Sequence, residues 1–314
     1  MSKNIGNLPQ LNGDVFLVDA GLETDFIFNK GIDIPEFAAH TLLPDAENRE
    51  QMKLYFNEFI DLAAQYNYGL ILDAPTWKAH NIWMSDLGCN ADDLEKVNHE
   101  AVSFVREIKN ESKSDIAIVL NGITGPCGDA YAPEDIMSVE DSEKYHAVQI
   151  SWLADAKADM VSALTFTQST EAAGYARAAS AIGIPCVISF TVETDGKLPS
   201  GQSLREAIEF VDSVSDSYPS YFMLNCAHPD HFAHVLDGSD WTARIRGLRC
   251  NASRQSHAEL DACEVLDDGD PVELGRQYRE LTSKLSHLNV FGGCCGSDIR
   301  HVREIAKAVT HKTT

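Results

Sequence analysis

The eleven residues IAIVLNGITGP at positions 116–126 contain the pattern that decides the fold, a short apolar run followed at once by a polar, glycine-rich turn. A run of this length is typical of a buried strand in a parallel sheet, and the Asn-Gly and Gly-Pro steps indicate where the strand ends. Including this one, eight short apolar runs followed by a turn occur along the 314-residue chain. We predict strands at 14–18, 68–72, 116–120, 160–164, 186–190, 221–225, 245–248 and 288–291.

Amphipathic stretches with a helical period lie between these runs. We predict helices at 48–66, 143–156, 204–214 and 299–309, the last with Ser297 as its N-cap. Strand and helix alternating eight times predict an α/β fold, a (β/α)8 TIM-type barrel that forms a single domain over residues 1–314. An open, doubly wound sheet is the alternative. The acidic stretch 261–271 is predicted to be an exposed loop.

Composition restricts the partners that we expect. The 25 basic and 48 acidic residues give a net charge of -23, which repels nucleic acid and anionic lipid and mildly favours a cationic substrate, or else serves solubility. No apolar stretch reaches the roughly 20 residues of a membrane helix. Because the N-terminus lacks the apolar segment of a signal peptide, we expect a cytoplasmic protein. Eight cysteines in such a chain favour metal binding or catalysis over disulfides.

Two of these cysteines are adjacent, in Gly292-Gly293-Cys294-Cys295-Gly296 directly after the last predicted strand. A disulfide between neighbouring residues would close a strained ring. Two thiolates on a tight turn instead favour a soft metal, with zinc as the first expectation. The alternative is a turn that carries two buried thiols without a metal.

The carboxyl ends of the strands carry the active site in barrels of this type. Cys226 follows the sixth predicted strand, and only one strand separates the sixth from the eighth. We therefore predict that Cys226 approaches Cys294 and Cys295 and that a zinc ion held there keeps its fourth position open, as catalytic sites do. His228 is a rival ligand.

Four segments together resemble the homocysteine S-methyltransferase family: Asp19-Ala20-Gly21, Asn121-Gly122-Ile123-Thr124-Gly125-Pro126, Asn225-Cys226 and the Gly292–Gly296 turn. The resemblance implies that Cys226, Cys294 and Cys295 hold a zinc ion and form the catalytic centre. It also implies that Asp19 and the glycine loop after the third strand shape an amino-acid pocket. The candidate substrate-binding residues are Asp19, Glu23, Trp77, Asn121, Gly125 and Thr165. Trp77 and Trp83 are candidates to hold a cation against an aromatic face.

The activity implied by this resemblance is methyl transfer to a thiol. A thiol bound to zinc loses its proton and can attack a methyl group on a positively charged sulfur or nitrogen. The partners are then a small-molecule thiol acceptor, homocysteine, and a cationic methyl donor. The length of the chain favours S-methylmethionine as donor, with S-adenosylmethionine and a betaine-like ammonium as alternatives. A homo-oligomer stays open.

Two departures from the family pattern leave the acceptor open. Leu164 stands where an acidic residue usually contacts the substrate ammonium, and the first turn reads Asp-Ala-Gly rather than Asp-Gly-Gly. Another thiol or a selenol therefore remains an alternative acceptor. Two further alternatives are a non-catalytic, redox-sensing zinc barrel and a metal-independent enzyme that uses Asp73 or Glu193.

Overall fold

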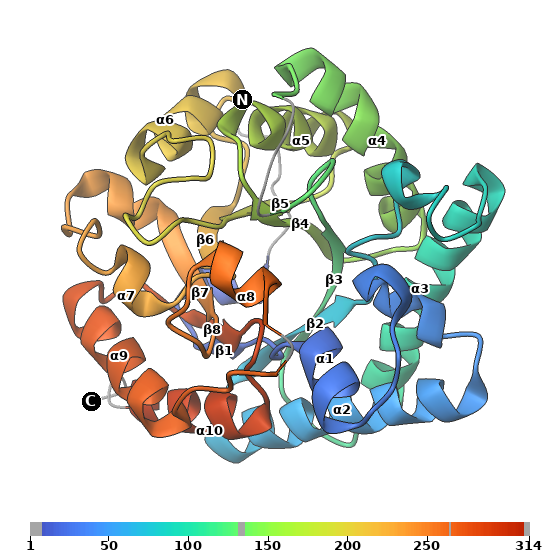
Figure 1. The fold of residues 1–314 in the computed structure, drawn as a ribbon, viewed down its shortest axis with the longest axis horizontal. Coiled ribbons are helices and arrows are strands. Elements are labelled where there is room, and N and C mark those ends of the chain that lie inside the picture. The colour runs from blue at the N-terminus through green and yellow to red at the C-terminus, as the bar shows by residue number, and fades with distance from the viewer. Residues whose placement is uncertain (1–7, 131–135, 264, 311–314) are drawn as a thin grey trace.

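The structure is a computed structural model that describes residues 8–130, 136–263 and 265–310. Across these residues eight parallel strands follow one another in chain order and close into a barrel, with the eighth paired to the first (Figure 1). The predicted fold class is confirmed, and the open sheet is wrong. The strands are β1 (Phe16–Leu17), β2 (Gly69–Ala74), β3 (Ile118–Thr124), β4 (Met160–Phe166), β5 (Cys186–Phe190), β6 (Tyr221–Asn225), β7 (Ile245–Cys250) and β8 (Val290–Gly293).

Each predicted strand overlaps an observed one, but several continue further than their apolar runs. β2 reaches Ala74 and β3 reaches Thr124, because the ladder between them continues through Asp73 paired with Asn121 and Ala74 paired with Gly122. Asp73 and Asn121 therefore lie within strands and not in the turns after them. Both side chains are buried, which places polar groups inside the barrel toward the carboxyl ends of its strands.

Helices surround the strands, and α1 and α8 lie in front of them in Figure 1. The predictions for α6 and α10 are confirmed residue for residue, while α2 and α4 begin two and four residues earlier than predicted. The helices are α1 (Leu22–Thr24), α2 (Ala46–Tyr66), α3 (Ala91–Glu111), α4 (Val139–Asp155), α5 (Ser169–Ile182), α6 (Leu204–Val214), α7 (Pro229–Phe232), α8 (His257–Asp261), α9 (Pro271–Lys284) and α10 (Ile299–Val309).

One helix start differs from the prediction. Asp298, not Ser297, is the N-cap of α10, and its side chain accepts a hydrogen bond from the Arg300 amide. The Ser297 hydroxyl is instead used by the preceding turn, where Oγ donates to the Cys294 carbonyl at 2.6 Å. The predicted loop at 261–271 is confirmed on the surface for its described residues, although its two end residues belong to α8 and α9.

The apolar core has two parts. One lies between the strands and the helices, and the other fills the inside of the barrel with side chains that include Val18, Ile71, Met160, Tyr221 and Val290. This inner cluster is a packed core and not a pore, as in other barrels of this kind. It leaves the carboxyl end of the barrel to polar side chains. Among the described residues, no helix is long and apolar enough to cross a membrane.

Candidate metal and substrate site

Three cysteine thiols converge at the carboxyl end of the barrel. Cys226 follows β6, Cys294 and Cys295 follow β8, and their sulfur atoms all lie within 4.8 Å of one another. The Sγ atoms of Cys226 and Cys295 are 3.5 Å apart. Sulfurs bound to a tetrahedral zinc ion at about 2.3 Å lie about 3.8 Å from one another. The three thiols therefore fit a zinc ion with small adjustments, and the predicted approach of Cys226 to the vicinal pair is confirmed.

The backbone of Cys226 is held in an unusual conformation. Its φ is 57°, a left-handed value that costs energy for a residue other than glycine and persists only where neighbours hold it. Its carbonyl oxygen lies 2.7 Å from His257 Nε2 and accepts hydrogen bonds from Asn251 Nδ2 at 3.1 Å and Thr191 Oγ1 at 3.3 Å. The other ring nitrogen of His257, Nδ1, lies 3.0 Å from Glu193 Oε1. These contacts fix the direction in which the Cys226 thiol points.

The turn that carries Cys294 packs against the end of β1. A Cβ on Gly293 would lie 2.0 Å from Ser297 Oγ, and a Cβ on Gly21 would lie 2.5 Å from the Cys294 carbonyl oxygen. These close approaches favour glycine both before Cys294 and at position 21 in the facing turn after β1. Hydrogen bonds from the Cys226 and Cys295 thiols hold the pKa of Cys294 well below its usual range. The same contacts raise the pKa of Cys226, so the metal-free cluster favours a thiolate at Cys294, the form that binds metal.

An arginine that the sequence interpretation missed lies directly below this cluster. Arg249, on β7, is 7% exposed and contacts two buried carboxylates. Its Nη2 donates to Asp19 Oδ1 at 2.5 Å, its Nη1 donates to Asp73 Oδ2, and its Nε donates to the Gly293 carbonyl at 3.3 Å. The available signal was an arginine just after an apolar run, since a buried charge requires partners. Asp19 and Asp73 therefore share Arg249 as their counter-ion.

Asn121 belongs to the same polar layer. Its Nδ2 donates to Asp73 Oδ1 at 2.7 Å, and its Oδ1 accepts from Ser162 Oγ at 3.0 Å. Leu164 and Arg249 line the same small interior cavity as these residues, so Leu164 faces the inside of the barrel. The structure thus places Asn121 among groups that hold Asp73 in position.

Thr165 contacts Asn225, the residue that precedes Cys226. Thr165 N donates to Asn225 Oδ1 at 2.9 Å, and Asn225 Nδ2 donates to Thr165 Oγ1 at 2.7 Å. Ser189 Oγ adds a third hydrogen bond to Asn225 Oδ1 at 2.6 Å, and Asn225 Nδ2 lies 3.9 Å from Cys294 Sγ. Thr165 therefore supports the β6 end that carries Cys226.

Trp77 lies across the neighbouring strands at the mouth of the barrel. Its Nε1 donates to the Leu164 carbonyl at 3.2 Å, and its own carbonyl accepts from the Gly125 amide at 2.8 Å. The next residue, Lys78, places its ammonium 3.7 Å from the centroid of the Trp83 ring and 5.8 Å from that of Trp77. The Trp83 face thus already contacts a cation that belongs to the chain.

Two more of the residues predicted from the sequence, Glu23 and His228, lie in contrasting environments. Glu23, on α1, is half-buried, and burial raises the pKa of Glu23 to about 7. His228, the rival ligand, is the N-cap of α7, where its Nδ1 accepts a hydrogen bond from the Asp230 amide at 3.2 Å. Among the described residues, the group with metal-binding geometry consists of the three cysteines without His228.

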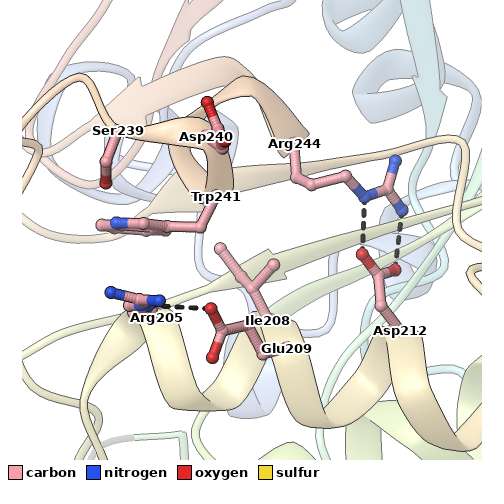
Figure 2. Close-up of a pocket in the computed structure, with 8 residues that line it drawn as sticks. All are labelled: Arg205, Ile208, Glu209, Asp212, Ser239, Asp240, Trp241 and Arg244. Carbon is pink, nitrogen blue, oxygen red and sulfur yellow. Dashed lines mark hydrogen bonds and ion pairs between the residues drawn. The ribbon is translucent and has the colours of Figure 1, made fainter.

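A larger cavity, about 460 Å³, lies on the outside of the barrel (Figure 2). Its arginines are already paired, Arg205 with Glu209 and Arg244 with Asp212. Arg244 ends the turn that leads into β7, so this cavity lies at the opposite end of that strand from the cysteines. Its lining residues are Arg205, Ile208, Glu209, Asp212, Ser239, Asp240, Trp241 and Arg244.

Known proteins resemble the chain over most of its length. Homocysteine S-methyltransferase 3 of Arabidopsis thaliana is 24% identical over 180 residues, which are 56% of this chain and 50% of that protein. The chain thus matches about half the length of this curated relative. The homocysteine methyltransferase MmuM from Escherichia coli has a similar structure, with 18% identity and a TM-score of 0.72 in its oxidized form, and 16% and 0.70 in its metallated form. Both cover 94% of this chain and 96% of MmuM, and at these identities they show the fold alone.

The family match covers the whole barrel. Residues 16–309 match the family described as Homocysteine S-methyltransferase, a range that begins at β1 and ends with α10. The match contains the three clustered cysteines and the polar layer beneath them. The chain therefore belongs to the homocysteine S-methyltransferase family.

Proposed function

We propose that the chain is a zinc-dependent methyltransferase that moves a methyl group from a sulfonium or ammonium donor, S-methylmethionine in the first place, to the thiol of homocysteine. The observation that carries the proposal is the convergence of the three sulfurs of Cys226, Cys294 and Cys295 at the carboxyl end of the barrel. Family membership supports the same activity. Three protein ligands also leave one tetrahedral position for a substrate thiol.

The donor set suits a soft metal. Cys226, Cys294 and Cys295 offer thiolate ligands, and thiolates select zinc over the hard cations magnesium and calcium. When bound there, zinc would deprotonate an entering thiol and present its sulfur as a nucleophile. The chain contributes the geometry: the contacts of His257, Asn251 and Thr191 to the Cys226 carbonyl hold one ligand in place before the metal arrives.

The reaction itself requires little further chemistry from the protein. The acceptor thiol loses its proton to solvent, and a sulfur lone pair forms the new bond to the methyl carbon. The bond from that carbon to the donor breaks, its electrons stay with the donor atom, and the donor leaves as a neutral thioether or amine. The residues around the cluster therefore act by orienting the two substrates for in-line displacement.

Methyl transfer is tested with the zinc-loaded protein, homocysteine and S-methylmethionine, by measuring methionine formed. We expect methionine, and we expect a chelator that removes the metal to abolish its formation. S-Adenosylmethionine, a betaine and other thiols or selenols complete the panel. Absence of transfer with every donor and acceptor would refute the proposal. Full activity in metal-free protein would favour the metal-independent enzyme instead.

The redox-sensing barrel predicts a different result in the same material. The 3.5 Å separation of the Cys226 and Cys295 sulfurs permits oxidation once the metal leaves, as does any close thiol pair. A sensor would bind and release zinc with the redox state but would not turn over substrate. Steady methionine production by the reduced, zinc-loaded protein separates the two functions.

A further inference from the structure

We propose that Glu23 and Lys78 bind the zwitterionic end of an α-amino acid substrate, with Glu23 meeting the ammonium and Lys78 meeting the carboxylate. The inference rests on the proposed function and names the residues that would recognise its substrate. It depends on which charged side chains at the carboxyl end of the barrel already have a partner of opposite charge.

The acidic side chain that would first be assigned to the ammonium is already engaged. Asp19 shares the Arg249 guanidinium with Asp73, and its Oδ1 lies 2.5 Å from Arg249 Nη2. Its second oxygen, Oδ2, lies 3.5 Å from the Tyr55 hydroxyl. Leu164 offers no charge on the β4 side. An ammonium that enters this site therefore needs a carboxylate other than Asp19.

Glu23 is placed to supply that carboxylate. It lies on α1, which is tied to the cysteine turn on both sides: Gly21 N donates to the Ser297 carbonyl at 3.2 Å, and Gly296 N donates to Thr24 Oγ1 at 3.1 Å. Glu23 is half-buried, and Cys294, Arg249 and Lys78 are the charged groups that act on its carboxylate. Within the described parts of the chain, its carboxylate makes no ion pair.

Lys78 is the matching cation. Its ammonium is half-buried in the loop after β2 and rests on the Trp83 ring at 3.7 Å. In the part of the chain that the structure describes, no carboxylate lies within ion-pair distance of its Nζ, although Glu36, Asp129, Glu23 and Asp86 act on it from further away. An ammonium offers three donors and prefers an anion as partner. A substrate carboxylate satisfies it and leaves the ring contact intact.

Glu23 follows β1 and Lys78 follows the neighbouring strand β2, so both lie at the carboxyl end of adjacent strands. Their opposite charges are close enough to influence each other, and among the described residues no ion pair joins them. Partly buried charges without partners cost free energy, and a ligand with the complementary charges recovers it. An α-amino acid carries both charges on one carbon. Homocysteine and S-methylmethionine share this end, so either the acceptor or the donor can be the one that is bound.

The test varies substrate and protein together. The acceptors are homocysteine, 4-mercaptobutanoate, which lacks the ammonium, and 3-mercaptopropylamine, which lacks the carboxylate. The donors are S-methylmethionine and trimethylsulfonium. The variants are Glu23→Gln and Lys78→Met, with the exposed residues Glu58→Gln and Lys144→Met as matched controls for charge. Calorimetric binding of L-methionine to each protein supplies a readout that does not require turnover.

We expect Glu23→Gln to raise KM for homocysteine by about tenfold, the scale of a charge-assisted hydrogen bond, and to leave KM for 4-mercaptobutanoate unchanged. Lys78→Met should likewise raise KM for homocysteine by about tenfold and leave KM for 3-mercaptopropylamine unchanged. If KM of the variants rises with S-methylmethionine as donor but not with trimethylsulfonium, the zwitterion that Glu23 and Lys78 bind belongs to the donor. L-Methionine should bind about tenfold more weakly to either variant and normally to the controls.

Equal losses with complete and truncated substrates, or no loss with any, would overturn the inference while the proposed function stands. A wild-type protein that transfers no methyl group refutes the proposed function. In that case, the inference survives only if L-methionine binds and its affinity falls in both variants.

Discussion

Arg249 Nη2 lies 2.5 Å from Asp19 Oδ1, so a buried arginine on β7 neutralises the acidic residue that follows β1. The same guanidinium contacts Asp73 on β2, and all three side chains are less than 9% exposed. Burial raises the pKa of Asp19 and of Asp73, and Arg249 opposes that rise. The guanidinium is thus the counter-ion of a charged layer directly beneath the cysteine cluster.

Replacing Arg249 with Met should destabilise the fold by about 3 to 5 kcal/mol, because two buried carboxylates then lose their counter-ion. Equilibrium unfolding in urea measures the change. Arg249→Met combined with Asp73→Asn should recover part of the loss, since one of the stranded charges is removed. A single variant as stable as wild type would show that the carboxylates are neutral in the folded protein.

Zinc binding should depend on three cysteines and not on the others. We expect one zinc per chain by elemental analysis, and less in each of Cys226→Ser, Cys294→Ser and Cys295→Ser, because a hydroxyl is a poor zinc ligand. Cys263→Ser, on the exposed surface, is the control and should keep its metal. Retention of full metal by one of the three would remove that residue from the site. Circular dichroism should stay unchanged, since the core of a barrel of this size does not depend on a metal.

His257 should matter to zinc although it is not a ligand. His257→Leu removes the 2.7 Å contact to the Cys226 carbonyl and releases the strained backbone there. Removing such an outer partner typically weakens metal affinity by about 10- to 100-fold. Competition with a fluorescent chelator measures the affinity. His257→Gln, which can still donate to the carbonyl, should retain more affinity than His257→Leu, and equal losses would deny His257 a positioning role.

Glu23 should make stability depend on pH in the metal-free protein. Burial raises its pKa from 4.5 to about 7, so the folded state holds the proton more tightly than the unfolded state does. Its contribution to stability is complete below about pH 4.5 and is lost as the pH rises through about 7. Glu23→Gln should therefore gain stability relative to wild type between pH 4 and pH 8 in urea unfolding experiments. A constant difference across this range would mean that the carboxylate is solvated.

Much of the site could be predicted because its residues follow the ends of strands. The proximity of Cys226, Cys294 and Cys295 could be predicted, since only β7 lies between β6 and β8 in a barrel closed in chain order. The prediction of Ser297 as a helix cap was wrong, because a serine before a helix can cap the helix or stabilise the preceding turn. Only the position of the Cys294 carbonyl, which accepts the Ser297 hydroxyl hydrogen bond, decides between these two roles. Arg249 and His257 were missed because neither lies in a motif.

The sequence by itself determined the eight strand and helix units and the three thiols at one end, because hydrophobic period and turn residues act over short distances along the chain. The tertiary structure alone decided that Arg249 neutralises Asp19, a residue 230 positions away, and Asp73, 176 positions away. It also decided that, among the described residues, neither Glu23 nor Lys78 forms an ion pair. The physical reason is that electrostatic pairing depends on distance in space and on burial, which no local pattern records.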